Sequence, residues 1–264
     1  MRYVTVLLLF PLLSAIVQPC CASAMAGGNV PGKIPASELV AEAGIAYRNG
    51  EFQKALGLYT RVREMGFVGG DLFYNIGNCY YRLGKKGMAV LNYERAKIMM
   101  PGDPDLGYNL GYVREQLEDK VNSGEGGLRT LLFWLDSVNV KEAVYAFVAA
   151  NFLFWGLVLL YLFFRKDVIW YLLMTGMFFW AVSALSAGIM WHDFRFDSRA
   201  VIVSPEAEVL SGPAEGDTLL FRLHEGTVAR EERREGEWSL VRISESRRGW
   251  TESRNLELIN PDIL

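Results

Sequence analysis

The side chains that most often carry catalysis or bind metals are few in this sequence and lie far apart. His192 and His224 are the only histidines among 264 residues, one beside an apolar stretch and one in a strand-rich segment, so a paired histidine site lacks support. No serine, cysteine or carboxylate group has a catalytic spacing, and no glycine-rich phosphate loop follows a strand. The sequence therefore predicts a protein that is not an enzyme and needs neither a metal nor a cofactor.

The composition is that of a membrane-associated chain. Hydrophobic residues make up 51% of the sequence, and the mean hydropathy of +0.14 is too apolar for an ordinary soluble protein. The length leaves room for two modest domains besides the apolar segments. The net charge of -3 provides no basic field of the kind that nucleic-acid binding needs, so nucleic acid is not an expected partner.

The first 24 residues have the pattern of a secretory signal peptide. A basic start precedes the apolar run Val4–Val17, and a tripeptide of small residues ends at Ala24. Cleavage after Ala24 would remove Cys20 and Cys21, whereas lipidation of one of these cysteines, or retention of the signal, is the alternative. After cleavage Cys79 is the only thiol, and its position predicts a buried structural residue.

A spacing of 34 residues recurs across three segments. Small residues at equivalent positions let paired helices approach closely, tyrosines fill the gap to the next pair, and glycines end each first helix. When segment 43–62 is placed over 77–96, four such positions align: Ala43 with Gly77, Gly50 with Gly84, Ala55 with Ala89 and Tyr59 with Tyr93. A further shift of 34 residues aligns Tyr74–Gly77 with Tyr108–Gly111.

These residue types at this spacing resemble the tetratricopeptide repeat. The first copy departs from the pattern because it lacks the closing proline. The resemblance implies an all-α solenoid over residues 36–120, in which a helix from about Asp105 to Glu118 serves as the cap. The second copy carries the pattern almost whole, at Phe73, Ile76, Gly77, Tyr80, Gly84, Ala89, Tyr93, Ala96 and Pro101.

The resemblance also implies a partner-binding groove, which in such repeats is lined by first-helix residues that point away from the second helices. Tyrosine rings give contact area at low entropic cost and a guanidinium binds a carboxylate bidentately, so an extended peptide or a carboxylate terminus is the expected ligand. The alternative is that several tyrosines only pack the helices. The candidates are Tyr47, Arg48, Tyr74, Asn78, Tyr81, Arg82, Tyr108 and Tyr112, with Val40, Gly44 and Glu115 beside them.

Two apolar stretches, 143–164 and 168–190, contain no charged side chain, and each can cross ~30 Å of hydrocarbon. The alternative is a buried hairpin in a soluble protein. An export signal followed by two spans places residues 36–120 and 200–260 on the same, extracytoplasmic side of a bacterial inner membrane. The basic residues of loop 165–167 then lie in the cytoplasm, as the positive-inside rule prefers.

Residues 121–142 are predicted to form a linker. Its first part is rich in glycine and polar residues, which is typical of a flexible connection. Leu128–Val138 contains Phe133, Trp134 and Leu135 among polar residues, so it could form a short amphipathic helix at the membrane interface.

Residues 200–260 change to short alternating runs separated by turn residues, which is typical of a small antiparallel β-structure. The landmarks Ser211–Pro213, Leu223–Thr227, Trp238–Arg242 and Gly249–Trp250 resemble those of the bacterial SH3 domain. The resemblance implies a small SH3-like barrel, and hence a multidomain protein with an all-α solenoid, a two-helix transmembrane hairpin and an all-β barrel.

This order of segments resembles the BatE family, membrane proteins of Bacteroides aerotolerance operons. The resemblance implies a non-enzymatic scaffold that binds protein partners on the periplasmic face, including other membrane components of the same operon, in a stress-tolerance complex. The alternative is a cell-wall anchor in which the barrel holds peptidoglycan. A transporter subunit is disfavoured because the spans contain no charged or broken-helix site.

Overall fold

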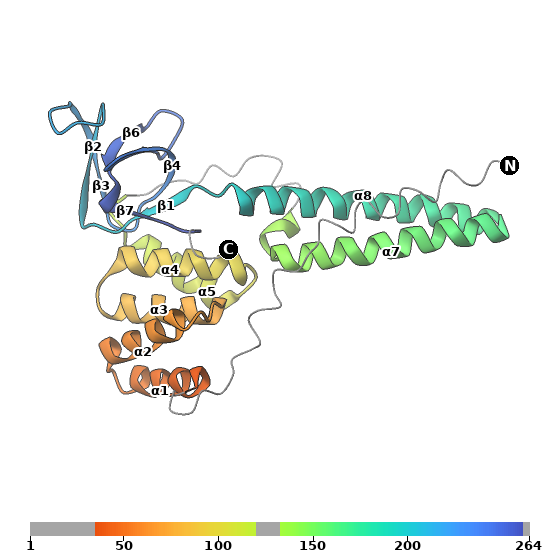
Figure 1. The fold of residues 1–264 in the computed structure, drawn as a ribbon, viewed down its shortest axis with the longest axis horizontal. Coiled ribbons are helices and arrows are strands. Elements are labelled where there is room, and N and C mark those ends of the chain that lie inside the picture. The colour runs from red at the N-terminus through yellow and green to blue at the C-terminus, as the bar shows by residue number, and fades with distance from the viewer. Residues whose placement is uncertain (1–34, 120–132, 261–264) are drawn as a thin grey trace.

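The computed structural model describes residues 35–119 and 133–260 (Figure 1). The predicted signal peptide, residues 1–24, and residues 121–132 of the predicted linker lie outside the described residues. The N-terminal part is all helical, as predicted. Its five helices are α1 (Ala36–Arg48), α2 (Phe52–Glu64), α3 (Gly70–Arg82), α4 (Lys86–Met99) and α5 (Pro104–Glu115).

The 34-residue period sets where the helices end and how closely they pack. Gly50 and Gly84 have φ angles of 81° and 77°, the left-handed conformation that ends a helix, so these two predicted ends are confirmed. A Cβ atom on Gly77 would lie 2.7 Å from the Tyr93 ring, which explains the need for a small residue. The predicted cap helix is present as α5, which begins one residue earlier than expected and ends at Glu115.

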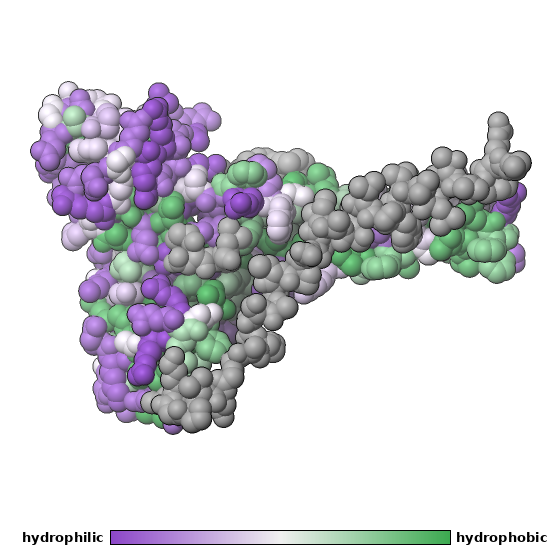
Figure 2. Space-filling view, viewed as in Figure 1, coloured by the Kyte–Doolittle hydropathy of each residue, from purple (hydrophilic) through white to green (hydrophobic). Residues whose placement is uncertain are grey.

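Two long helices form a hairpin, α7 (Val140–Phe164) and α8 (Asp167–Arg195). Within the described residues both are long and apolar enough to cross a membrane, with mean hydropathies of 2.2 and 1.8 over their most apolar windows. Almost none of either window is buried, so the reading as the core of a soluble protein is disfavoured. Hydrophobic residues dominate the visible face of the hairpin (Figure 2).

The base of the hairpin is a defined structure. Asn139 caps α7 by accepting a hydrogen bond from the Glu142 backbone N–H at 2.9 Å, and the Glu142 carboxylate accepts from the Asn139 N–H at 3.0 Å. Just before it, Phe133–Asp136 form one turn of 3-10 helix. The amphipathic helix expected over 128–138 is present only as this short turn within the described residues.

The C-terminal part is an antiparallel sheet, which confirms the predicted β-structure. The hydrogen-bonded order is β3-β2-β6-β5-β4-β1-β7. The strands β3 and β7 are therefore the two edge strands, and the sheet is open, unlike the barrel expected from the sequence. The carbonyls of Leu258 and Ile259, at the end of β7, accept hydrogen bonds from a helix side chain instead of from another strand. The strands are β1 (Arg199–Ile202), β2 (Glu206–Leu210), β3 (Leu219–His224), β4 (Val228–Glu235), β5 (Trp238–Arg242), β6 (Arg248–Glu252) and β7 (Leu256–Leu258).

The helices and the sheet form one body at one end of the hairpin (Figure 1). Val201 of β1 and Ile259, which follows β7, are fully buried in the same hydrophobic cluster as Phe73, Val90 and Leu106 of the helices. A second cluster fills the space between α1, α2 and α3, and a third lies within the sheet. The helical region and the sheet therefore lie at the same end of the two apolar helices.

Candidate functional site

One hollow in the helical region collects most of the predicted groove residues. Its volume is about 240 Å³, and it opens between α1, α3 and α5 with one ring from α4. We call it the tyrosine hollow. Its lining residues are Tyr47, Asn78, Tyr81, Arg82, Tyr93, Tyr108, Asn109, Tyr112 and Val113.

Six of the eight predicted groove residues line the tyrosine hollow, and two do not. Arg48 lies at the end of α1 and folds back along it, with a guanidinium nitrogen 3.5 Å from the position of a Cβ atom on Gly44. Tyr74 is half-buried beneath the hollow, where its hydroxyl accepts a hydrogen bond from Asn109 at 2.8 Å. Arg48 therefore lies along its own helix and Tyr74 links α3 to α5, and neither lines the hollow.

Asn78 is held in place by hydrogen bonds from two helices. Its side-chain carbonyl accepts from the Tyr93 hydroxyl of α4 at 2.7 Å and from the Asn109 amide of α5 at 3.2 Å. These bonds fix which way the Asn78 side chain points. The floor of the tyrosine hollow is thus pre-organised by a network that joins three helices.

The rim of the tyrosine hollow is aromatic and open. Tyr108 is 73% exposed and Tyr112 is 48% exposed, and their rings stack with centroids 6.4 Å apart. Tyr81 meets Tyr112 edge to face at 6.1 Å. Exposed rings of this kind offer flat apolar area with few rotamers to freeze on binding, so the rim suits an extended chain.

Arg82 provides the only charge among the residues lining the tyrosine hollow. It is exposed, and its guanidinium lies 4.5 Å above the centre of the Phe52 ring. Burial raises the pKa of Tyr47, although nearby Arg82 opposes the rise, and burial also raises the pKa of Tyr93. The hydroxyls of Tyr47 and Tyr93 are therefore neutral at physiological pH and can donate hydrogen bonds, while the Arg82 guanidinium can bind a negative group.

Sequence reasoning missed Tyr93, Asn109 and Val113. Tyr93 was expected to fill the gap to the next repeat; its ring lies against Gly77 of α3 instead, and its hydroxyl reaches the floor of the hollow. Asn109 is adjacent to the predicted Tyr108 in the sequence and lies 35 residues after Tyr74, one more than the repeat period. This spacing was the available signal for the hydrogen bond between Asn109 and Tyr74. The repeat fixes backbone positions, whereas these contacts depend on where side chains turn.

The sheet packs against α4, at one end of the stack of helices (Figure 1), through contacts that the sequence does not predict. The Arg95 side chain of α4 is only 2% exposed, and it donates hydrogen bonds to the carbonyls of Ile259 (3.1 Å) and Leu258 (2.9 Å) and to the Glu257 carboxylate (2.9 Å). Its guanidinium also lies 5.9 Å from the centre of the Phe73 ring. We call this contact region the α4–sheet interface.

Two carboxylates complete the α4–sheet interface. The Glu94 side chain is 1% exposed and pairs with Arg114 of α5 and with Arg199 of β1, the latter at 3.4 Å. Asp119 accepts hydrogen bonds from the His224 backbone N–H and the Thr227 hydroxyl, both at 2.8 Å. Burial acts to raise the pKa of Asp119, but these hydrogen bonds outweigh it and lower the pKa below its ordinary value.

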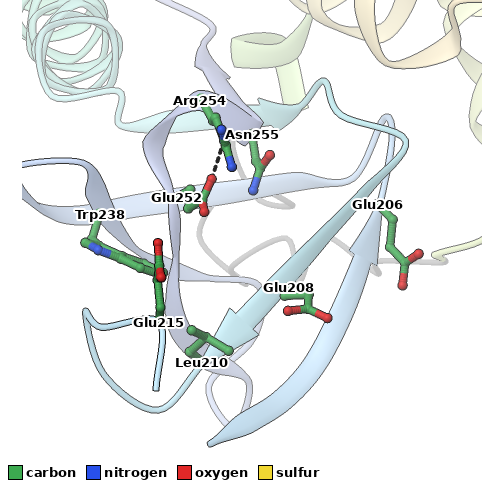
Figure 3. Close-up of a pocket in the computed structure, with 8 residues that line it drawn as sticks. All are labelled: Glu206, Glu208, Leu210, Glu215, Trp238, Glu252, Arg254 and Asn255. Atoms are coloured by element: carbon green, nitrogen blue, oxygen red, sulfur yellow. Dashed lines mark ion pairs between the residues drawn. The ribbon is translucent and has the colours of Figure 1, made fainter. Parts of the chain in front are cut away.

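A second hollow, of about 300 Å³, lies on the sheet and is lined largely by acidic residues (Figure 3). Glu206 and Glu208 pair with Arg222 at 3.0 and 3.1 Å, and Glu252 pairs with Arg254. Within the described residues, no group of three histidine, cysteine or carboxylate side chains could hold a metal ion. Three of the four carboxylates that line this hollow therefore belong to surface ion pairs.

Cys79 is fully buried in the cluster between α1, α2 and α3, as the sequence predicts. Burial raises the pKa of its thiol to about 11, so the thiolate is scarce at neutral pH and the residue is unreactive. Cys79 is therefore a packing residue and adds no chemistry to the tyrosine hollow.

Comparisons with protein-family models, with curated proteins and with solved structures find no match to this chain.

Proposed function

We propose that this protein is a non-enzymatic, membrane-anchored adaptor that binds an extended segment of a partner protein in the tyrosine hollow. The single observation that carries the proposal is the convergence of six predicted groove residues, from three different helices, on one open hollow. A hollow with an aromatic rim, neutral hydroxyls, an oriented amide and one guanidinium fits a peptide better than it fits a small reactive substrate.

The finer assignment of the domains is part of the same proposal. The 34-residue period and the small residues at helix contacts support tetratricopeptide repeats. The short antiparallel strands with their turn motifs support an SH3-like module, even though the sheet is open. Segment order supports a BatE-type role on the extracytoplasmic face of a bacterial inner membrane, in a stress-tolerance complex with other membrane proteins.

The α4–sheet interface supports an adaptor rather than two independent modules. Buried charged side chains with several partners hold α4, β1 and β7 in fixed positions, because each guanidinium or carboxylate would be costly to leave unpaired. Because α4 contributes Tyr93 to the tyrosine hollow and Arg95 to this interface, the hollow keeps a fixed orientation relative to the sheet. A partner held there would be presented in a constant orientation.

The test is affinity purification with crosslinking of the intact protein from its membrane, comparing wild type with an Arg82→Ala, Tyr108→Ala double variant. Both side chains are exposed, so the variant is expected to fold and to lose its partners. Asn78 is unsuited to this test, because its carbonyl joins α3 to α4 and α5.

The matched control is Arg61→Ala, which removes an exposed arginine from α2 outside the hollow. We expect the control to recover the same partners as wild type. Equal yields from the double variant and wild type would reject the tyrosine hollow as the partner site.

A further inference from the structure

A pair of apolar side chains is exposed at the turn between α2 and α3. Phe67 is 44% exposed and Val68 is 46% exposed, next to Gly66, whose φ angle of 87° allows the tight turn. Neither residue belongs to the three hydrophobic clusters of the described chain. Two adjacent large apolar residues at the tip of a turn need a reason, because turns are normally polar.

This turn is next to the part of the helical region that contacts the hairpin. A Cβ atom on Gly70, at the start of α3, would lie 2.2 Å from the Met100 side chain, so the turn packs against the end of α4. The Met99 carbonyl at that end accepts a hydrogen bond from Asn139, the cap of α7, at 3.5 Å. A chain of direct contacts thus connects the Phe67–Val68 turn to the base of the apolar helices.

The base of the hairpin lies at the level where the bilayer surface is expected. The uncharged stretch of α7 begins at Ala143, one turn after Asn139. Trp134, just before the hairpin, donates a hydrogen bond to Ser186 of α8 at 3.2 Å, so an amphipathic ring lies beside the last turns of the second apolar stretch. The α4–α5 turn, which touches Ser137 through Gly102, therefore lies close to the interface.

The helices of the repeats are stacked along a direction that makes a large angle with the axis of the hairpin. In Figure 1 the hairpin extends to one side, while α4, α3, α2 and α1 are stacked one below another, at a large angle to it. Because α2 and α4 are one repeat apart, the α2–α3 turn and the α4–α5 turn lie at the same side of the stack, the side from which the hairpin leaves. The Phe67–Val68 turn therefore faces the bilayer, as the α4–α5 turn does.

Basic side chains lie close to the turn. The last turn of α2 carries Arg61 and Arg63 and the last turn of α4 carries the exposed Lys97, while the exposed acidic residues Glu64 and Asp71 lie on either side of the turn. An apolar tip flanked by basic residues is the pattern by which proteins insert into the headgroup region of anionic bilayers.

We propose that Phe67 and Val68 form a second membrane contact, which dips into the headgroup region of the bilayer and holds the helical region down against its surface. This proposal rests on the proposed anchoring of the hairpin in a membrane. It assigns the lipid bilayer, rather than a second copy of the chain, as the partner of the exposed turn.

The test uses the full chain in anionic vesicles with an environment-sensitive dye on a single cysteine, in a background with Cys20 and Cys21 changed to Ser; Cys79 is buried and unreactive. Val68→Cys places the dye on the turn, Lys141→Cys places it at the hairpin base, and Lys85→Cys places it on the α3–α4 turn at the opposite side. We expect blue-shifted emission and quenching by nitroxide-labelled lipids at positions 68 and 141, but not at 85.

A dye at 68 that is no more quenched than the dye at 85 would overturn the proposal. Blue-shifted emission at 68 without lipid quenching would also overturn it, because a protein surface or a second copy would then cover the turn. Failure of the anchoring itself is distinguishable, since the dye at 141 would then be unquenched and alkaline carbonate would strip the protein from the vesicles.

Discussion

Two arginines, each near a phenylalanine ring, lie in opposite surroundings in the helical region. Arg82 lies 4.5 Å from the centre of the Phe52 ring and is exposed at the tyrosine hollow. Arg95 lies 5.9 Å from the centre of the Phe73 ring, but its side chain is 2% exposed and its N–H groups bond to the end of β7. The comparison teaches that burial, rather than the contact with a ring, decides how much an arginine contributes to the fold.

The sharpest way to break this comparison is to truncate each arginine in turn. We expect Arg95→Ala to lower the free energy of unfolding by about 3–5 kcal/mol, because it orphans two carbonyls and empties a buried site. Arg82→Ala should cost at most about 1 kcal/mol, the value of an exposed cation–π contact. Thermal unfolding of the detergent-solubilised protein measures both, and equal losses would contradict the distinction.

A second comparison concerns equivalent glycines in successive repeats. Gly77→Ala should lower the free energy of unfolding by about 1–3 kcal/mol, because the new Cβ atom meets the Tyr93 ring at 2.7 Å. Gly111 is 34 residues later, is exposed and has nothing within 4 Å, so Gly111→Ala should stabilise by up to about 1 kcal/mol through helix propensity. The same unfolding measurement applies, and effects of the same sign would argue against the repeat geometry.

The α4–sheet interface should also respond to pH through Asp119. Its pKa is lowered in the folded protein, so its stabilising contribution is complete above the ordinary value of 3.8 and is lost as the pH falls through the folded pKa. Asp119→Asn should cost about 1 kcal/mol at neutral pH, since a charged acceptor becomes a neutral one. The difference from wild type should shrink below about pH 4; a constant difference down to pH 3 would contradict the assignment.

The smallest effect on stability is expected at the rim of the tyrosine hollow. Tyr108→Ala removes a side chain that is 73% exposed, so the free energy of unfolding should change by no more than about 0.5 kcal/mol. Partner recovery should nevertheless fall, because the rim loses one of its two stacked rings. Unfolding and pull-down yield, measured on the same preparation, separate the two effects, and a large loss of stability would class Tyr108 as structural.

Local patterns were sufficient to predict most of the elements. Ala43, Ala55 and Ala89 are fully buried as the 34-residue period requires, because the spacing of small residues reports helix contacts directly. The strands were predictable because alternation along a short segment has only one consistent explanation. The openness of the sheet was not predictable, since it depends on β7 ending against α4 rather than against β3.

The α4–sheet interface could not be predicted from one sequence. Glu94 and Arg95 are consecutive charged residues in a helix, a pattern that normally marks a solvated face, and their partners on the sheet lie more than 100 residues away. The tyrosine hollow was easier, because its residues recur at fixed positions on successive first helices. Arg48 was the exception, since a long side chain can fold back along its own helix.

The bond between Arg95 and Ile259 spans 164 residues, and the whole membrane hairpin lies within that interval. At ordinary translation speeds, the ribosome needs on the order of ten seconds to make this length of chain. The surface of α4 that contacts the sheet therefore remains uncovered during synthesis until both apolar helices have been made. The last residues of the sheet complete the folded body, so its final hydrogen bonds report that the whole chain has been synthesised.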